Sequence, residues 1–139
     1  MSSYDTRNAL LTKLISSAIV SEANIAYENK TFKPTGKTLW LSVHFLPATN
    51  DILGKTSGSK NEQRGIFQIS VYVAKNAADF DNVQLQTVDS LLSEFIYNSQ
   101  ASSNGQIVDI LEATVNVGSE SESWFKRDLS INYLTFSTR

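Results

Sequence analysis

The sequence predicts an α+β fold, in which two amphipathic helices pack on one face of an antiparallel sheet of four to five strands. Two observations predict this class. Four segments alternate apolar and polar residues with the period of two found in half-buried strands. Two other segments repeat apolar residues with the period of a helix, and the expected order is α-β-β-α-β-β. Alternating strands suit a sheet with one covered face, and the two helices are its natural cover.

The length and composition fit one domain over residues 1–139. The chain has 139 residues, of which 41% are hydrophobic, and this is enough to bury a core without metal or disulfide bonds. It has no cysteine, which excludes thiolate metal sites. The net charge of -2 argues against a nucleic-acid binder driven by bulk charge. Neither a secretory signal nor a membrane span is expected, so synthesis in the cytoplasm is predicted.

Residues 6–20 are expected to form the first helix. Apolar residues recur three or four positions apart in this segment and make a single stripe along one side. Asp5 comes just before the segment and is the expected N-cap. The stripe consists of Leu10, Leu11, Leu14, Ile15, Ala18 and Ile19.

Two alternating segments, residues 38–46 and 65–74, predict the first pair of long strands, and a short strand is possible near Ile25. Pro47 is expected to end the first of them. Residues 48–64 are polar and are predicted to be a loop of 17 residues, much longer than the usual connection of about 4–6. A loop of that length in a compact domain is either functional or locally disordered. The apolar faces are Leu39, Leu41, Val43 and Phe45 in the first strand, and Phe67, Ile69, Val71 and Val73 in the second.

Asp79 is expected to cap the second helix, over residues 80–97. Residues 98–105 are predicted to be a solvated linker, and residues 118–123 a turn between the last two strands. Those strands are predicted over residues 106–117 and 124–136. Expected apolar positions are Leu85, Val88, Leu91, Leu92, Phe95 and Ile96 in the helix, Ile107, Leu111, Ala113, Val115 and Val117 in the third strand, and Phe125, Leu129, Ile131 and Tyr133 in the fourth. Leu134 and Phe136 fall out of phase, which predicts a bulge or burial on two sides.

The sequence does not contain a set of reactive residues that would indicate an enzyme. His44 is the only histidine, so a histidine-rich metal site is impossible and a catalytic triad would depend on this one residue. Two Gly-Lys-Thr triplets, at 36–38 and 54–56, lack the glycine that a phosphate-binding loop places five positions earlier. Glu120 and Glu122 alternate with serines in a turn where nothing apolar would shift their pKa values. We therefore expect no catalytic residue, no metal and no cofactor.

Several local strings, taken in order, resemble a known family. They are residues 25–29 (Ile-Ala-Tyr-Glu-Asn) followed by Phe32 and Pro34, the strand 39–45 ending in Leu-Pro-Ala, the strand 65–72, and the C-terminal Trp124-Phe125 that leads to residues 129–133. This order is similar to the tail terminator and minor tail proteins of long-tailed phages and their prophage relatives. The resemblance covers nearly the whole chain, and it depends on the register of all the strings together.

The resemblance implies a structural virion protein with an α+β fold and without catalytic residues. Members of that family assemble as hexameric rings on the last ring of the tail tube, stop its growth, and present a surface to the head-completion proteins. Genomic DNA would pass through the ring without sequence-specific binding, and assembly would take place in the host cytoplasm. A head–tail joining protein or another minor tail protein is the alternative within the virion. A small ligand-binding α+β domain is the alternative outside it.

Eight residues are candidates for contacts between subunits or with the tube. Four lie off the apolar phase of their strands, and aromatic residues in such positions are favoured at interfaces. The other four are charged residues of the predicted long loop, which would project from the domain. For the aromatic residues, a second small core or a strand face under a loop is an equally good interpretation. The candidates are Trp40, His44, Tyr72 and Trp124 on the strands, and Asp51, Lys55, Lys60 and Arg64 in the loop.

Overall fold

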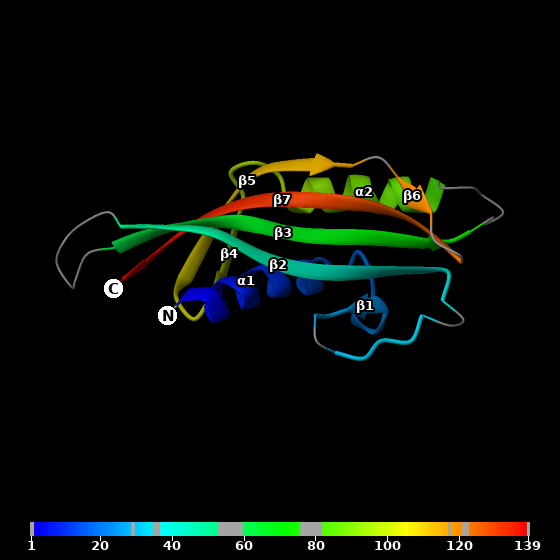
Figure 1. The fold of residues 1–139 in the computed structure, drawn as a ribbon, viewed down its shortest axis with the longest axis horizontal. Coiled ribbons are helices and arrows are strands. Elements are labelled where there is room, and N and C mark those ends of the chain that lie inside the picture. The colour runs from blue at the N-terminus through cyan, green and yellow to red at the C-terminus, as the bar shows by residue number, and fades with distance from the viewer. Residues whose placement is uncertain are drawn as a thin grey trace.

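The computed structural model shows a curled sheet with two helices, and about half of the chain is strand (Figure 1). It describes residues 2–28, 30–34, 37–52, 60–75, 82–116, 118–120 and 123–138. The elements in chain order are α1 (Ser2–Ser17), a 3-10 turn (Glu22–Asn24), β1 (Ile25–Ala26), β2 (Leu39–Ile52), β3 (Lys60–Ala74), α2 (Asn82–Glu94), β4 (Gln100–Ser103), β5 (Gln106–Val115), β6 (Ser119–Glu120) and β7 (Trp124–Thr138).

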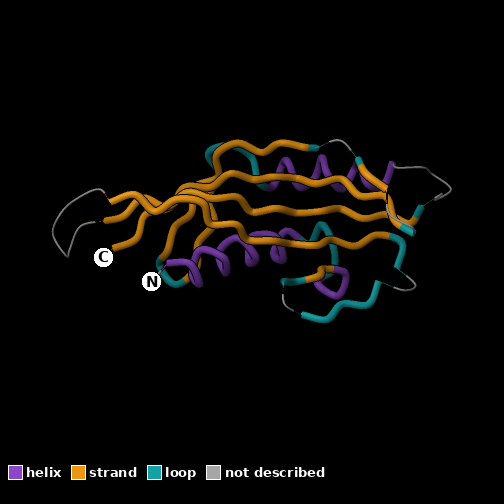
Figure 2. The backbone as a smooth tube through the Cα atoms, viewed as in Figure 1, coloured by secondary structure: helices purple, strands orange, loops and turns teal. Residues whose placement is uncertain are grey.

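The predicted fold class is wrong, because the fold is mostly β and its sheet is mixed. Seven strands lie in the order β1-β2-β3-β7-β5-β4, with β6 beside β7 (Figure 2). β1 pairs with β2 in parallel, and all other pairs are antiparallel. β4 lies where a solvated linker was predicted over residues 98–105, and β6 lies where a turn was predicted over residues 118–123, so both predictions are wrong. β1 corresponds to the short strand considered near Ile25. Each of the three has only two to four residues, too few to show periodicity, and each pairs with the end or edge of a longer strand.

The predicted loop over residues 48–64 is also wrong at both ends. β2 continues through the position of Pro47 to Ile52, and β3 begins at Lys60. A register shift between Pro47 and Thr49 accommodates the proline. An edge strand tolerates proline because the N–H that proline lacks is not needed for pairing on the open side of the strand. Polar strands of this kind are held by backbone pairing, so their composition alone resembles that of a loop.

The alternation predicted for β2 and β3 is confirmed. The odd-numbered residues of β2, β3 and β7 face the helices and form one buried cluster with them, so both helices lie on the same face of the sheet. The fully buried members include Leu41, Ile69, Val71, Leu129 and Ile131. The even-numbered residues therefore form the opposite face of the sheet, which no helix covers.

Both helices differ from the prediction at their ends and in their buried stripes. α1 begins at Ser2, so Asp5 lies inside its first turn, where it accepts a hydrogen bond from the Asn104 amide at 3.2 Å. α1 ends before Ala18, whose φ of 56° is left-handed. In α2 the buried residues are Gln84, Val88 and Leu91, while the predicted core residue Leu85 is exposed. The expected cap Asp79 lies outside the described residues.

A bulge in β5 explains another error. Its pairing with β7 shifts register between Ile110 and Ala113, so the inward face changes from even to odd positions along the strand. Val108 and Ile110 are fully buried, whereas Ile107, predicted to face inward, is 54% exposed. The irregularity predicted for the last strand thus lies in its neighbour, and β7 pairs with β3 without interruption from Trp124 to Thr138.

Gly65 and Tyr133 face each other across β3 and β7 where the sheet leaves the core. A Cβ atom at Gly65 would lie 2.5 Å from the Tyr133 hydroxyl oxygen and 2.6 Å from the Leu46 carbonyl oxygen. The tyrosine ring therefore occupies the space that a side chain would need, and it also stacks on Phe45 with ring centroids 5.5 Å apart. Only glycine fits at this position.

Candidate assembly interface

The sheet extends beyond the helices as a three-stranded projection, which we call the arm. It consists of residues 47–52 of β2, 60–65 of β3 and 133–138 of β7, and both helices lie beside the other part of the sheet (Figure 1). Only three of its described residues, Gly65, Tyr133 and Thr135, are buried. Its backbone pairing is nonetheless continuous with that of the core.

Three of the four charged interface candidates belong to this arm. Arg64 is exposed and its Nε donates to the Glu62 carboxylate at 2.6 Å. Asp51 and Lys60 lie on its strands near the tip, although their side chains are outside the described part of the structure. Lys55 lies outside the described residues altogether. The structure therefore places Asp51, Lys60 and Arg64 on paired strands and not on a loop.

The aromatic interface candidates lie together at the opposite end of the sheet, on the face without helices. Trp40 stacks on Tyr72 with ring centroids 4.0 Å apart, and it meets Trp124 edge-on at 5.7 Å. Phe32, which lies in the segment before β2, packs against Trp40 with ring centroids 5.0 Å apart. All are partly buried. The Trp40 indole N–H is buried and has no hydrogen-bond partner among the described residues.

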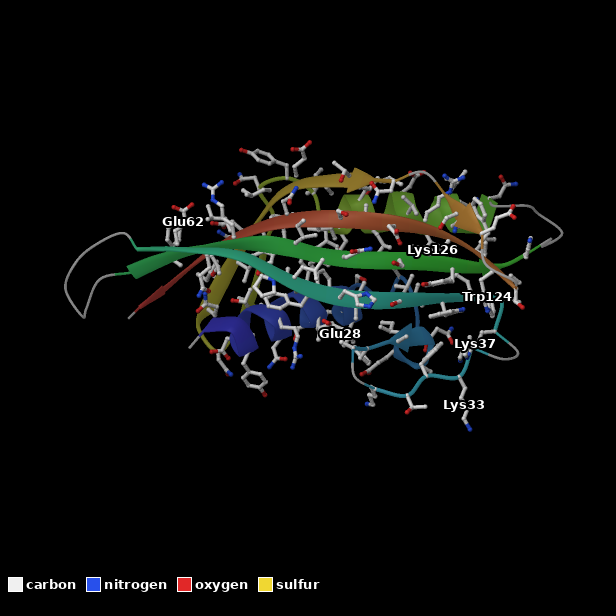
Figure 3. The ribbon with its side chains drawn as sticks, viewed as in Figure 1. Glu28, Lys33, Lys37, Glu62, Trp124 and Lys126 are labelled. Atoms are coloured by element: carbon white, nitrogen blue, oxygen red, sulfur yellow. The ribbon has the colours of Figure 1, made fainter. Side chains whose placement is uncertain are left out.

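His44 lies on the same face between the two groups, and it is exposed. It stands opposite Gln68 of β3, in the polar middle of the sheet. Nearby, the Ser70 hydroxyl donates to the Asp128 carboxylate at 2.6 Å, and Lys126 lies 3.7 Å from the same carboxylate. Figure 3 shows Glu62 on the arm, with Trp124 and Lys126 at the other end of the sheet. The described candidates are thus spread along the sheet and do not converge on a pocket.

The sequence interpretation missed Gln84, the buried polar residue that joins α2 to the sheet. Its amide nitrogen donates to the carbonyl oxygens of Val71 at 2.8 Å and Phe125 at 3.1 Å. Its amide oxygen accepts from Arg127 Nε at 3.0 Å. The sequence gives no signal that Gln84 is buried. Its spacing to Val88 and Leu91 fits a core stripe, but a glutamine can be buried there only if its amide atoms find hydrogen-bond partners.

The described titratable residues form no metal-binding cluster, and two tyrosines among them have raised pKa values. No three of their histidine, aspartate or glutamate side chains gather to hold a metal. Burial raises the pKa of Tyr133 to about 12. Burial, together with the Glu22 carboxylate 3.3 Å from its hydroxyl, also raises the pKa of Tyr27. Both phenols are therefore kept protonated. Neither described helix is long and apolar enough to cross a membrane.

Comparisons with known proteins agree with the resemblance found in the sequence. The family model described as phage tail terminator protein matches residues 5–133. A solved structure with 21% sequence identity has a TM-score of 0.75 over 97% of this chain and 96% of that one, which supports the fold alone. No curated protein matches at a significant level. The predicted family is confirmed, and it indicates a structural component of the virion tail that contacts other tail proteins. The chain therefore belongs to the phage tail terminator protein family.

Proposed function

We propose that the protein caps the end of a phage tail tube as a homo-hexameric ring. The ring ends polymerisation of the tube and forms the surface that the head-completion protein joins. The observation that carries this proposal is the family match, which extends over residues 5–133 and so includes most of α1, all of α2, the core and the parts of the arm that belong to β2 and β3.

The arm is the proposed contact with the tube or with a neighbouring subunit. It extends past the helices (Figure 1), it has little core of its own, and a ring subunit needs surface beyond its own core. Asp51, Lys55, Lys60 and Arg64 are its proposed contact residues. At the other end, Trp40, Tyr72 and Trp124 are proposed to contact a partner through their exposed parts, and His44 lies on the same face.

Genomic DNA is proposed to pass through the lumen of the ring without sequence-specific binding. The net charge of -2 provides no excess of cations that would hold a phosphate backbone in place. Assembly would occur in the host cytoplasm, where tubes, rings and heads meet.

The test is to add the purified chain to polymerising tail-tube protein from the same phage. We expect shorter tubes, each ending in a hexameric ring visible by negative-stain imaging, and a hexamer in light scattering alone or on the tube. A protein that stays monomeric and leaves tube length and tube ends unchanged would refute the proposal. Labelling the protein in the intact particle separates the tube end from other positions in the virion.

A further inference from the structure

The sheet has two edges that are only partly paired, on opposite sides of the molecule, at β2 and at β5. β1 covers β2 only at Leu41 and Ser42, and no described strand pairs with the outer edge of β2 beyond that point. On the other side, β4 pairs with residues 106–109 of β5, so no described strand pairs with the outer edge of residues 111–115. Exposed edges of this kind tend to pair with another chain.

The β2 edge lies over a hollow of about 210 Å³ with an apolar floor and a basic rim. Its floor is formed by Leu11, Val43, Phe45 and Phe67. The Glu28 carboxylate accepts the Phe45 N–H at 2.6 Å and thus occupies one backbone donor of β2. The other charged residues of the rim are Arg7 and Lys30, and neither forms an ion pair with a described residue. The rim thus has a net charge of +1.

The β5 edge lies over a hollow of about 460 Å³, between that strand and the end of α2. Its apolar lining includes Ile96 and Tyr97, which are 59% and 72% exposed. Large apolar side chains with this exposure mark contact sites when they gather beside a hollow. Glu112 is the only charged residue that lines it, and it forms no ion pair with a described residue. This side therefore has a charge of -1.

We propose that the β5 edge of one copy docks head-to-tail on the β2 edge of the next copy, with Glu112 facing Arg7 and Lys30. This inference deepens the proposed ring and rests on it. The exposed Ile96 and Tyr97 would enter the neighbour's hollow above Leu11 and Phe45. A second copy is the occupant because the same chain carries both halves, which are opposite in charge and lie on opposite sides of the sheet.

The arrangement explains why neither edge is fully covered within the subunit. A contact between two different patches forms a ring when the rotation closes, and closure would leave no free edge. A contact between identical patches would instead place two basic or two acidic rims against each other.

A charge reversal tests the proposal. We expect Arg7→Glu and Glu112→Arg each to weaken ring assembly at least about tenfold, because like charges then face each other across the contact. The double variant Arg7→Glu with Glu112→Arg should restore assembly towards the wild-type level. Lys33→Glu and Asp89→Arg are matched controls, since they make the same charge changes at exposed positions that line neither hollow. Native mass spectrometry measures ring assembly of the free protein, and the size of the ring on tube ends measures assembly there. Circular dichroism verifies folding.

The outcomes separate this inference from the proposed function. A wild-type ring whose formation is unaffected by either reversal would overturn the docking surfaces and leave the capping role intact. Loss in both single variants without recovery in the double variant would also overturn them. Normal rings that no longer bind tube ends would assign the patches to the tube protein instead. A wild-type chain that forms no ring, alone or on tubes, would refute both proposals.

Discussion

At the base of the arm, Tyr133 connects three strands through its side chain. Its ring stacks on Phe45 of β2 and fills the space beside Gly65 of β3, and it is only 2% exposed. The sequence predicted its inward direction from the phase of β7. It could not predict the missing Cβ opposite, because the closeness of Gly65 depends on a pairing between residues 68 positions apart.

Burial of Tyr133 predicts a loss of stability in alkaline solution. Its pKa is about 12 in the folded chain and 10.0 as the ordinary value, so the unfolded chain loses this proton first as the pH rises. The contribution of Tyr133 to the free energy of unfolding is fully present below pH 10. It should fall between pH 10 and 12, by up to about 1.4 kcal/mol per pH unit. Tyr27 acts in the same direction.

Urea unfolding of wild type and Tyr133→Phe at several pH values between 9 and about 12 measures this effect, since the variant keeps the ring and lacks the titrating proton. Tyr97→Phe, which removes the same hydroxyl group from an exposed ring, is the matched control. The prediction would be contradicted if the free energy of unfolding changed equally with pH in wild type and in Tyr133→Phe.

At the scale of elements, α2 is held to the sheet by a polar contact as well as by its apolar stripe. Gln84 lies at the start of the helix and reaches carbonyl groups of both β3 and β7. Long strands with strict alternation, such as β2 and β3, could be predicted because burial on one face imposes the period of two. The bulge in β5 and the short strands could not, since they depend on a partner strand that is distant in the sequence.

Replacing Gln84 with alanine should destabilise the fold by about 2–4 kcal/mol, because the change leaves buried carbonyl oxygens without a donor and opens a cavity. Gln86→Ala, two positions further along α2 at an exposed site, should change stability by less than about 0.5 kcal/mol. Chemical denaturation followed by circular dichroism compares the two variants. Similar free energies of unfolding would show that the Gln84 contacts contribute little.

At the scale of the whole molecule, core and arm should be separable. Replacing residues 51–62 with Asn-Gly joins the paired residues Asn50 and Gln63 by a tight hairpin turn. The removed segment carries two acidic and two basic residues, so the net charge does not change. We expect a folded protein with a melting temperature within about 5 °C of wild type that no longer caps tubes. Thermal unfolding and the tube-length assay measure both effects, and capping at the wild-type level would contradict the role of the arm.

The candidate interface could be predicted in part at this scale. Trp40, Tyr72 and Trp124 were selected because they lie out of phase with the core, and the fold brings these three together. The exposed hollow beside Glu112 was not predicted. It is formed by the end of α2 and the bulged part of β5, and neither sequence segment indicates on its own that the other is adjacent.

The unbroken course of β2, β3 and β7 from core to arm has a mechanical consequence. A force applied to the arm along the strand direction loads many interstrand hydrogen bonds in shear at the same time. It does not open them one by one from an end. Tension between a tail and a head would then be carried by the backbone pairing of three strands, from Lys60↔Thr138 at the tip to Ala74↔Trp124 at the far end. The subunit would behave as a short, stiff tie between the parts that it joins.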